Sequence, residues 1–428
     1  MTSHIAQPVA LPCGAVLPNR LAKAAMTEGL ADAMNRATER HETLYRRWAE
    51  GGAGLLITGN VQVDRLHLER PGNIAIDGNG GLDALCRLAK AGTSAGNHLW
   101  MQINHPGRQT PSSVNPRPLA PSAIALAAQE AGCGEPQAMT EAQVEDVIAR
   151  FVHAASVAQN CGFTGVQIHA AHGYLLSQFL SPLSNDRRDS WGGSLENRAR
   201  ILMEIVRGVR QAVGADFPIS VKLNSADFQK GGFSDEESMQ VVRWLGDEGI
   251  DLLEISGGNY EQMCMIGRTD DQMDRAKPLA ESTRRREAYF LDYAARVRPL
   301  ASMPLMITGG FRSRDAMEEG LRAGELDVVG LARPLCVDAD ICRKLLTGAR
   351  DRAPSPEDEL SIDRAALGPE VDDKTLRTTE SWAQVAWSCM QLLRMGNGED
   401  PDLRMSLLEA LVGYDANEKA ALAALCRS

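Results

Sequence analysis

Eight short apolar runs, each bounded by turn residues and followed by a helical pattern, constrain the fold of this 428-residue sequence more than any other feature. Nearly continuous apolar strands are typical of a parallel sheet that is covered on both faces. Eight strands that alternate with helices predict an α/β fold, a (β/α)8 TIM barrel. The runs lie approximately at residues 21–27, 54–60, 98–104, 165–169, 218–224, 251–257, 304–310 and 326–332.

The helical segments begin at recognisable capping residues. Thr140 with Gln143, and Ser234 with Glu237, form two capping boxes before segments with apolar positions on one face. A doubly wound open sheet is the competing architecture, but its first strand-to-helix turn should contain Gly-x-Gly-x-x-Gly, and here that turn reads AAMTEGLAD. Further helical patterns fall near residues 40–50, 81–95, 195–213, 286–298, 314–323 and 339–347.

The composition shifts near residue 350 and divides the chain into two parts. We predict that residues 1–350 form the barrel domain, which includes a long loop at 105–139 of the kind that serves as a lid or binding loop. Residues 351–428 are predicted to form a charged, proline-containing linker and a C-terminal helical extension of two or three helices. The apolar positions of these helices suit packing against the barrel or against a sister subunit, and the second case predicts a homo-oligomer.

Charge and composition argue against several classes of partner and site. A net charge of −11 argues against nucleic acid and against an anionic membrane as partners. Residues 151–185 lack charged side chains, but polar residues interrupt them too often for a membrane span. The amino terminus shows no secretory signal, so we expect a cytoplasmic protein. The nine cysteines are scattered and never spaced Cys-x-x-Cys, which predicts reduced thiols and no iron–sulfur cluster.

Polar residues and glycines occupy the carboxyl ends of the predicted strands, where a barrel has its active site. The fourth run ends at His169, and His172 and Tyr174 follow it in the turn, so these three residues are the candidate catalytic groups. The strand ends contain hydrogen-bond donors and no carboxylate, which suits an anionic, carbonyl-rich ligand. The candidate ligand-binding residues at these ends are Ala25, Met26, Thr27, Asn60, Gln102, Lys222, Gly309, Gly310 and Arg333.

The run HAAHGYLLSQFLSPLSNDRRDSWGGSLENRAR, which begins at His169, resembles the signature of the Old Yellow Enzyme family of flavin-dependent ene-reductases. The resemblance covers roughly residues 8–348 and implies a barrel that carries FMN. Three positions depart from the family: Trp191 replaces a usual tyrosine, Thr58–Gly59–Asn60 replaces Thr-Glu-Ala or Thr-Glu-Gly, and Lys222 replaces a frequent arginine. The barrel also resembles the FMN domain of bacterial 2,4-dienoyl-CoA reductase.

The resemblance implies that the candidate ligand-binding residues hold FMN, and it adds Ala332, next to Arg333, to this set. Thr27 matches the position that hydrogen-bonds flavin O4, and Gln102 is able to donate to and accept from the pyrimidine edge of the ring. Lys222 or Arg333 would stabilise negative charge near N1 and O2 of the reduced ring. Gly309–Gly310 would let backbone N–H groups approach the phosphate.

The resemblance also implies a reaction, the reduction of the activated C=C bond of an enone, enal or nitro compound. NADH or NADPH would supply the hydride, and the sequence leaves both open as reductants. His169 and His172 would hydrogen-bond the activating oxygen of the substrate, on which negative charge develops. Tyr174 would then protonate the α-carbon.

Three other functions stay open on the sequence alone. A Schiff-base aldolase would use Lys222, although we expect no carboxylate partner for it at neighbouring strand ends. A metal-dependent hydrolase would use His169 and His172, which leaves the site one ligand short. A barrel that keeps a flavin as a structural ligand would show no turnover with NADH or NADPH.

Overall fold

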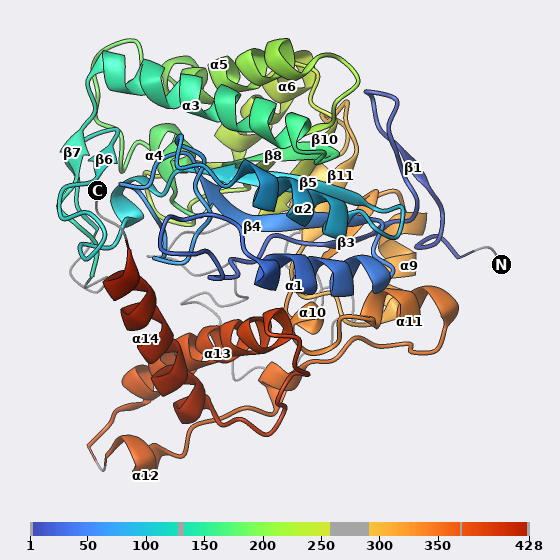
Figure 1. Cartoon of the computed structure of the whole chain (residues 1–428). Coiled ribbons are helices and arrows are strands. Elements are labelled where there is room, and N and C mark those ends of the chain that lie inside the picture. Colours follow the sequence, from blue (N-terminus) through green and yellow to red (C-terminus); the bar gives the residue numbers. More distant parts are fainter. Residues whose placement is uncertain (1–2, 127–131, 257–290, 369, 426–428) are drawn as a thin grey trace.

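A closed barrel of eight parallel strands forms the centre of the molecule (Figure 1). The computed structural model describes residues 3–126, 132–256, 291–368 and 370–425. The strands follow one another around the barrel in chain order, and each predicted apolar run overlaps one of them, so the (β/α)8 prediction is confirmed. The strands are β3 (Leu21–Lys23), β4 (Leu55–Gln62), β5 (His98–Asn104), β8 (Gly165–Ala170), β9 (Ile219–Asn224), β10 (Leu252–Ser256), β11 (Leu305–Thr308) and β12 (Val328–Leu331).

Helices alternate with these strands and surround the barrel. Both predicted capping boxes are present, because the side chains of Thr140 and Ser234 accept hydrogen bonds from the backbone N–H groups of Gln143 and Glu237. The start of the helix predicted at 286–298 lies outside the described residues. The helices are α1 (Glu39–Glu50), α2 (Leu82–Gly92), α3 (Glu141–Asn160), α4 (Leu175–Leu180), α5 (Leu195–Val213), α6 (Asp235–Asp247), α8 (Leu291–Val297), α9 (Arg314–Arg322), α10 (Pro334–Val337) and α11 (Ile341–Thr347).

The barrel interior changes from apolar to polar along its axis. Trp100 and Leu252 belong to a buried apolar cluster, which the hairpin of β1 (Val9–Ala10) and β2 (Val16–Leu17) joins through Leu17. Two residues further along β5 and β10 the interior positions are Gln102 and Glu254, because side chains on one face of a strand recur every second residue. The carboxyl ends of the strands therefore carry the polar groups.

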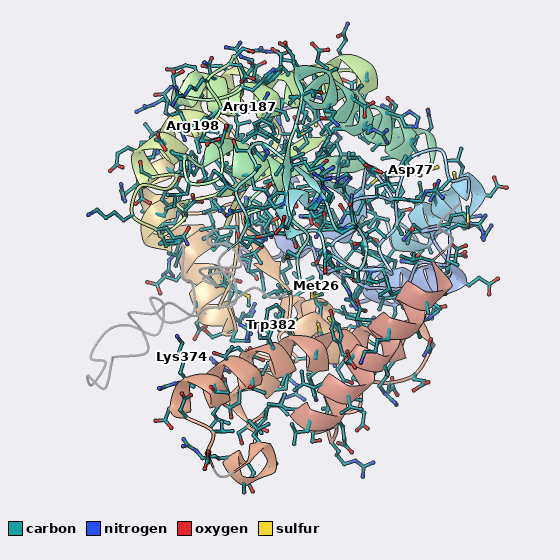
Figure 2. The ribbon with its side chains drawn as sticks, turned by 90° about the vertical axis from the view of Figure 1, so that its left-hand side faces the viewer. Met26, Asp77, Arg187, Arg198, Lys374 and Trp382 are labelled. Atoms are coloured by element: carbon teal, nitrogen blue, oxygen red, sulfur yellow. The ribbon has the colours of Figure 1, made fainter. Side chains whose placement is uncertain are left out.

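Two long helices after the barrel form the larger part of the C-terminal segment (Figures 1 and 2). They are α13 (Asp373–Gly396) and α14 (Leu407–Ala424), and η4 (Pro356–Asp358) and α12 (Arg364–Leu367) precede them. Helix α13 packs against α1, α10 and α14. Trp387 of α13 and Leu407 of α14 are buried together in a small core of their own. The helical extension is thus present, while its assignment as a separate part of the chain stays a prediction.

The long loop after β5 is only partly irregular. It contains η1 (Gly107–Gln109) and a small parallel sheet of β6 (Leu119–Ala120) and β7 (Gln137–Ala138). In the part of the chain that the structure describes, no helix has the length and apolar character needed to cross a lipid bilayer.

Candidate active site

The rings of His169, His172 and Tyr174 lie together at the carboxyl end of β8. Their centroids are separated by 5.0 Å between the two histidines, 4.9 Å between His169 and Tyr174, and 6.5 Å between His172 and Tyr174. His169 belongs to β8, His172 to the turn, and Tyr174 is the N-cap of α4. The sequence therefore predicted correctly that these three side chains gather at one place.

The turn between β8 and α4 has an unusual backbone. His172 has a φ of 61° and Gly173 a φ of 73°, and a histidine in this left-handed region is uncommon. Two contacts stabilise it: the backbone N–H of His172 donates to Asn224 Oδ1 at 3.1 Å, and His172 Nε2 lies 2.6 Å from Ser256 Oγ. Such backbone conformations persist where the surroundings impose them, and they are concentrated at functional sites.

Both histidines are neutral near pH 7. Burial lowers the pKa of His169 and of His172 well below its ordinary value, and the charge of Lys222 lowers both further. His169 Nδ1 accepts a hydrogen bond from the backbone N–H of Ala171 at 3.2 Å. The proton of the neutral ring is therefore on Nε2, so that His169 presents one N–H donor.

A chain of buried polar contacts crosses the interior from β5 to β10. Gln102 Nε2 donates to Gln167 Oε1 at 2.7 Å, and Gln167 Nε2 donates to Glu254 Oε2 at 2.8 Å. Lys222 Nζ lies 3.0 Å from Glu254 Oε1, and His169 and Lys222 are paired in register on neighbouring strands. Gln102 and Lys222 are thus brought into the same layer as His169.

The expectation that no carboxylate lies beside Lys222 is wrong. Glu254 is fully buried on the adjacent strand and faces Lys222 directly. It escaped prediction because it lies inside the apolar run LLEIS, two residues before the strand end at which polar residues were sought. Lys222 is taken up in an ion pair with this carboxylate, so the correction does not favour an aldolase, which needs a free amine.

A second carboxylate, Glu69, was also missed. It accepts hydrogen bonds from Thr27 Oγ1 at 2.9 Å, from Asn60 Nδ2 and from the hydroxyl of Tyr174. The loop that carries Glu69 follows β4 and contains neither helix nor strand, so hydrophobic periodicity gave no reason to place it near the site. While Thr27 donates its single hydrogen to Glu69 it cannot donate to flavin O4, and that contact stays a prediction.

A bulge in β4 sets the position of Asn60. The register of β4 against β5 shifts between Ile57 and Asn60, after which Asn60 pairs with Gln102. A side chain at Gly59 would meet the carboxylate of Glu28 at 2.3 Å, so only glycine fits there. Glycine at position 59 therefore suits the close packing at this point of β4.

The remaining candidate residues follow β3, β11 and β12. Gly309 and Gly310 have φ values of 131° and 84°, which side chains rarely tolerate, and Arg333 follows β12, the strand next to them. Arg333 Nη1 lies 3.4 Å from Glu357 Oε1, so part of its charge is already balanced. Ala25, Met26, Thr27 and Ala332 are partly exposed, and Met26 lies next to Cys336 of α10. No described contact joins the Gly309–Gly310 turn to the histidines.

The interior polar groups fit a flavin. Asn60 Oδ1 and Thr308 Oγ1 are buried and have no hydrogen-bond partner among the described residues. Orphaned buried polar atoms are rare in folded proteins, and a ligand with both N–H and C=O groups would satisfy them. The lysine and the amide side chain of Gln102 complete a donor set that matches the edge of an isoalloxazine ring.

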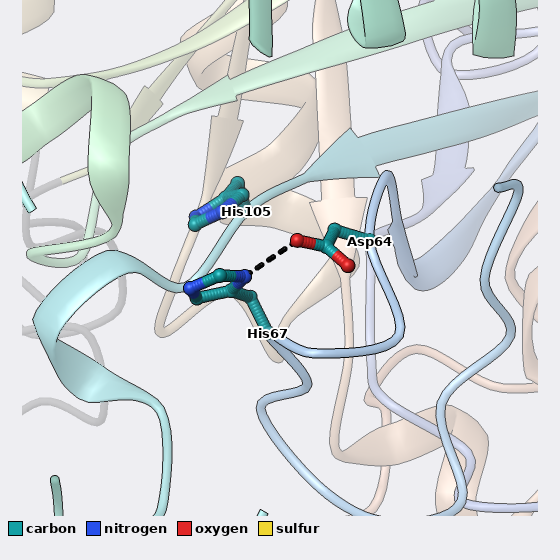
Figure 3. Close-up of side chains that lie close together, drawn as sticks. All are labelled: Asp64, His67 and His105. Carbon is teal, nitrogen blue, oxygen red and sulfur yellow. Dashed lines mark hydrogen bonds and ion pairs between the residues drawn. The ribbon is translucent and has the colours of Figure 1, made fainter. Parts of the chain in front are cut away.

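Asp64, His67 and His105 form the one cluster of three metal-ligating side chains found in the described part of the chain (Figure 3). His67 Nδ1 lies 2.6 Å from Asp64 Oδ2, and His67 Nε2 accepts from the backbone N–H of Leu119 at 3.0 Å. His105 Nδ1 accepts from the backbone N–H of Gly107 at 3.0 Å. When one nitrogen of a histidine ring binds a metal, the other carries a proton. In both rings that proton would clash with the backbone N–H group that the nitrogen accepts from. The cluster is therefore a hydrogen-bond network rather than a metal site.

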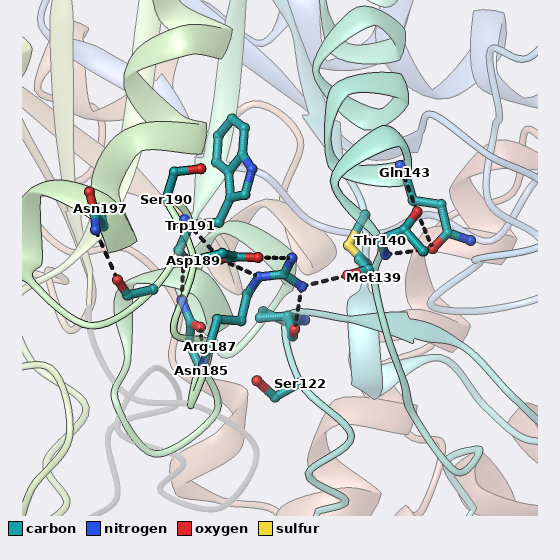
Figure 4. A network of polar contacts seen from close by, with 12 residues as sticks. Ser122, Met139, Thr140, Gln143, Asn185, Arg187, Asp189, Ser190, Trp191 and Asn197 are labelled. Atoms are coloured by element: carbon teal, nitrogen blue, oxygen red, sulfur yellow. Dashed lines mark hydrogen bonds and ion pairs between the residues drawn. The ribbon is translucent and has the colours of Figure 1, made fainter.

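Residues 185–191, in the second half of the signature run, contact the loop that follows β5 (Figure 4). Arg187 Nη1 donates to the carbonyl oxygen of Pro121 at 3.0 Å, and its Nη2 lies 2.6 Å from Asp189 Oδ2. Asn185 Nδ2 donates to the carbonyl oxygen of Trp191 at 2.9 Å, and Trp191 is buried. This segment holds the loop around Pro121 against the barrel, and the tryptophan keeps the buried aromatic position of the signature.

The chain matches one protein family over most of its length. The model of the NADH:flavin oxidoreductase / NADH oxidase family matches residues 5–352. NADH-dependent flavin oxidoreductase nadA of Aspergillus parasiticus is 35% identical over 399 residues, which are 90% of this chain and 83% of that protein. NADH-dependent flavin oxidoreductase iliE of Neonectria sp. is 35% identical over 411 residues, 91% of this chain and 51% of that protein, so this chain spans about half of it.

Two solved structures share the fold. A 2-naphthoyl-CoA reductase in complex with 2-naphthoyl-CoA has a TM-score of 0.72 at 27% identity and covers 81% of this chain and 52% of that one. Morphinone reductase has a TM-score of 0.67 at 21% identity, with 83% of this chain and 92% of that chain covered. The second likeness concerns the fold alone.

Proposed function

Because this chain belongs to the NADH:flavin oxidoreductase / NADH oxidase family, whose members are FMN-dependent oxidoreductases that use NAD(P)H, we propose that it reduces activated C=C bonds. Its substrates would be α,β-unsaturated carbonyl or nitro compounds. The observation that carries the proposal is the convergence of His169, His172 and Tyr174, with ring centroids 4.9–6.5 Å apart. Two neutral rings beside a phenol suit a substrate oxygen that becomes negative and a carbon that must be protonated.

The proposed FMN site uses residues from several strand ends. Gln102 and Asn60 would hydrogen-bond the pyrimidine edge, and Lys222 would stabilise negative charge on the ring. Arg333 is the alternative to Lys222 for that role. Gly309–Gly310 would hold the phosphate, with Ala25, Met26, Thr27 and Ala332 against the ring. The chemistry that bound FMN supplies is hydride transfer, from the nicotinamide and then to the alkene.

The proposed work of the histidines is electrostatic. His169 has its Nε2 proton available, because a backbone N–H occupies Nδ1. A donor from a neutral ring stabilises the oxygen as charge develops on it and needs no proton transfer. Low pKa values keep both rings in this form across the neutral range.

The proposal also covers the partner, the location and the domain organisation of the protein. The partner is a small molecule and no nucleic acid, which the acidic net charge of −11 supports. We further propose that the protein is cytoplasmic and that it associates through its C-terminal helices. Residues 1–350 would be the catalytic domain.

One experiment tests the reaction. Purified protein is reduced anaerobically with NADH or with NADPH until the flavin bleaches, and is then mixed with 2-cyclohexenone. We expect the flavin colour to return and cyclohexanone to form in equal amount. If oxygen restored the colour while the enone did not, and no saturated ketone formed, C=C reduction would be wrong and an oxidase would take its place.

A further inference from the structure

The carboxylate of Glu69 touches the proposed proton donor. It accepts hydrogen bonds from Thr27 after β3, from Asn60 in β4 and from Tyr174 at the start of α4. Three elements far apart in the sequence thus hold one carboxylate at the carboxyl end of the barrel.

We propose that Glu69 is a positioning residue for Tyr174, and that its protonation decides whether the Tyr174 proton is available to the substrate. The inference rests on the proposed function, in which Tyr174 protonates the α-carbon. Glu69 would be a second acid in that reaction, which acts on Tyr174 and does not touch the substrate.

The number of hydrogens on each group decides which of them donates in this contact. A phenol has one hydrogen, and an ionised carboxylate only accepts, so ionised Glu69 holds the Tyr174 hydrogen in their shared bond. A protonated carboxyl has a hydrogen of its own and donates it to the phenol oxygen. The phenol hydrogen is then released from this bond and is directed to the substrate.

The proton balance closes without another reactant. The O–H bond of Tyr174 breaks as its proton joins the substrate carbon, which has already received hydride. Glu69 passes its proton to the Tyr174 oxygen, so no free phenolate persists. Ionised Glu69, which is partly exposed, then takes a proton from water.

The surroundings of Glu69 favour the protonated form more than water does. Burial raises its pKa and is the largest effect, while the hydrogen bonds it accepts and the charge of Arg70 lower the pKa. Beyond Tyr174, the other titratable groups that face it are Cys389 of α13 and Tyr414 of α14, whose pKa values burial raises, so both are uncharged. Among the groups named here, Arg70 is the one that brings a positive charge to Glu69. Arg70 is itself paired with Glu418 of α14 at 2.6 Å.

Glu69→Gln is the variant that tests the inference. Glutamine keeps an oxygen to accept from Thr27 and Asn60 and offers Tyr174 an N–H, but it does not titrate. Glu145→Gln, an exposed change on α3, is the matched control. Reduced holoenzyme is mixed with 2-cyclohexenone in a stopped-flow instrument between pH 5 and pH 9, and infrared difference spectra follow the carboxyl band over the same range.

The expected results differ between the variants. In the wild type and in Glu145→Gln, flavin reoxidation slows about tenfold per pH unit above one ionisation, and the carboxyl band disappears with the same midpoint. Glu69→Gln loses both the band and this pH dependence. In a Tyr174→Phe background, Glu69→Gln changes nothing further, because the residue acts through the phenol.

Two outcomes overturn the inference, and they are distinguishable. If Tyr174→Phe slows reoxidation while Glu69→Gln keeps the wild-type pH profile, Glu69 has no such role and the proposed function stands. If Tyr174→Phe leaves reoxidation unchanged, the assigned proton donor is wrong, and the role of Glu69 is lost with it. A uniform slowing at every pH in Glu69→Gln would indicate a merely structural side chain and would also overturn the inference.

Discussion

Few residues other than glycine and asparagine adopt the backbone of His172, which has a φ of 61°. Asn224 and Ser256, from the two neighbouring strands β9 and β10, hold this residue through its N–H and its ring. The ring is therefore fixed in place by strands rather than by its own loop. A change at this position alters the imidazole and the turn together, and an asparagine separates the two effects because it tolerates the turn.

Replacing both His169 and His172 by alanine should weaken the binding of a phenol, which resembles the developing enolate, and leave FMN bound. Each lost donor is expected to reduce the binding free energy by about 1–3 kcal/mol. The measurement is a titration that follows the long-wavelength flavin absorbance. His172→Asn, which keeps the turn, should lose less than the double variant; unchanged phenol affinity in the double variant would contradict the assigned role.

Tyr174→Phe should affect one half-reaction and spare the other. A positioned general acid contributes ~10²–10⁴-fold, so reoxidation of the reduced flavin by an enone should slow by that order. Reduction by NADH or NADPH requires no such proton and should be nearly unchanged. Stopped-flow traces of both half-reactions make the comparison, and equal slowing of both would instead mean that the phenol only shapes the site.

At the scale of elements, the sequence predicted what depends on local pattern. Apolar runs predicted all eight strands, and the capping boxes at Thr140 and Ser234 marked two helix starts correctly. Glu254 was missed because one buried polar residue does not disturb an apolar run. Glu69 was missed because its position depends on tertiary contacts of a loop, for which no periodicity exists.

The C-terminal helices reach this same loop through Arg70. Arg70 is buried, its Nη2 lies 2.6 Å from Glu418 Oε1 of α14, and its Nη1 donates to the carbonyl oxygen of Thr27 at 3.2 Å. The guanidinium also lies 4.9 Å from the ring centroid of Tyr414. One arginine therefore connects α14 with the backbone beside the candidate site.

Glu418→Ala should loosen α14 and the loop that carries Arg70. Removing one partner leaves the buried guanidinium without its carboxylate, so we expect the free energy of unfolding to fall by about 1–3 kcal/mol. This is less than for a fully buried pair, because Glu418 is partly exposed. Hydrogen exchange of α14 and of residues 63–77 is the measurement. Lys419→Ala is the control, because the exposed Lys419–Asp415 pair on the same helix contributes little; equal protection in the two variants would count against the coupling.

At the scale of the whole molecule, several buried histidines tie stability to pH. Burial lowers the pKa values of His41, His105, His169 and His172, so each is neutral in the folded chain. In the unfolded chain they would titrate near 6.5 and take up protons first, so the free energy of unfolding falls as pH falls below about 6.5. The raised pKa values of Glu69 and Asp227 act in the opposite sense, because the folded chain then binds the proton more tightly.

His41→Gln isolates one of these contributions. Burial lowers the pKa of His41 to about 4, and its Nδ1 accepts from the backbone N–H of Thr38 at 3.1 Å as part of the capping box of α1. Between about pH 4 and 6.5 the unfolded chain binds this proton and the folded chain does not, so the wild type should lose up to about 1.4 kcal/mol of stability per pH unit on acidification from this residue alone. Glutamine serves the same capping box without titrating, which leaves a flatter slope over that window and little change above pH 7. Urea unfolding of the holoenzyme at several pH values measures both slopes, and parallel slopes for the two proteins would show that His41 is protonated equally in both states.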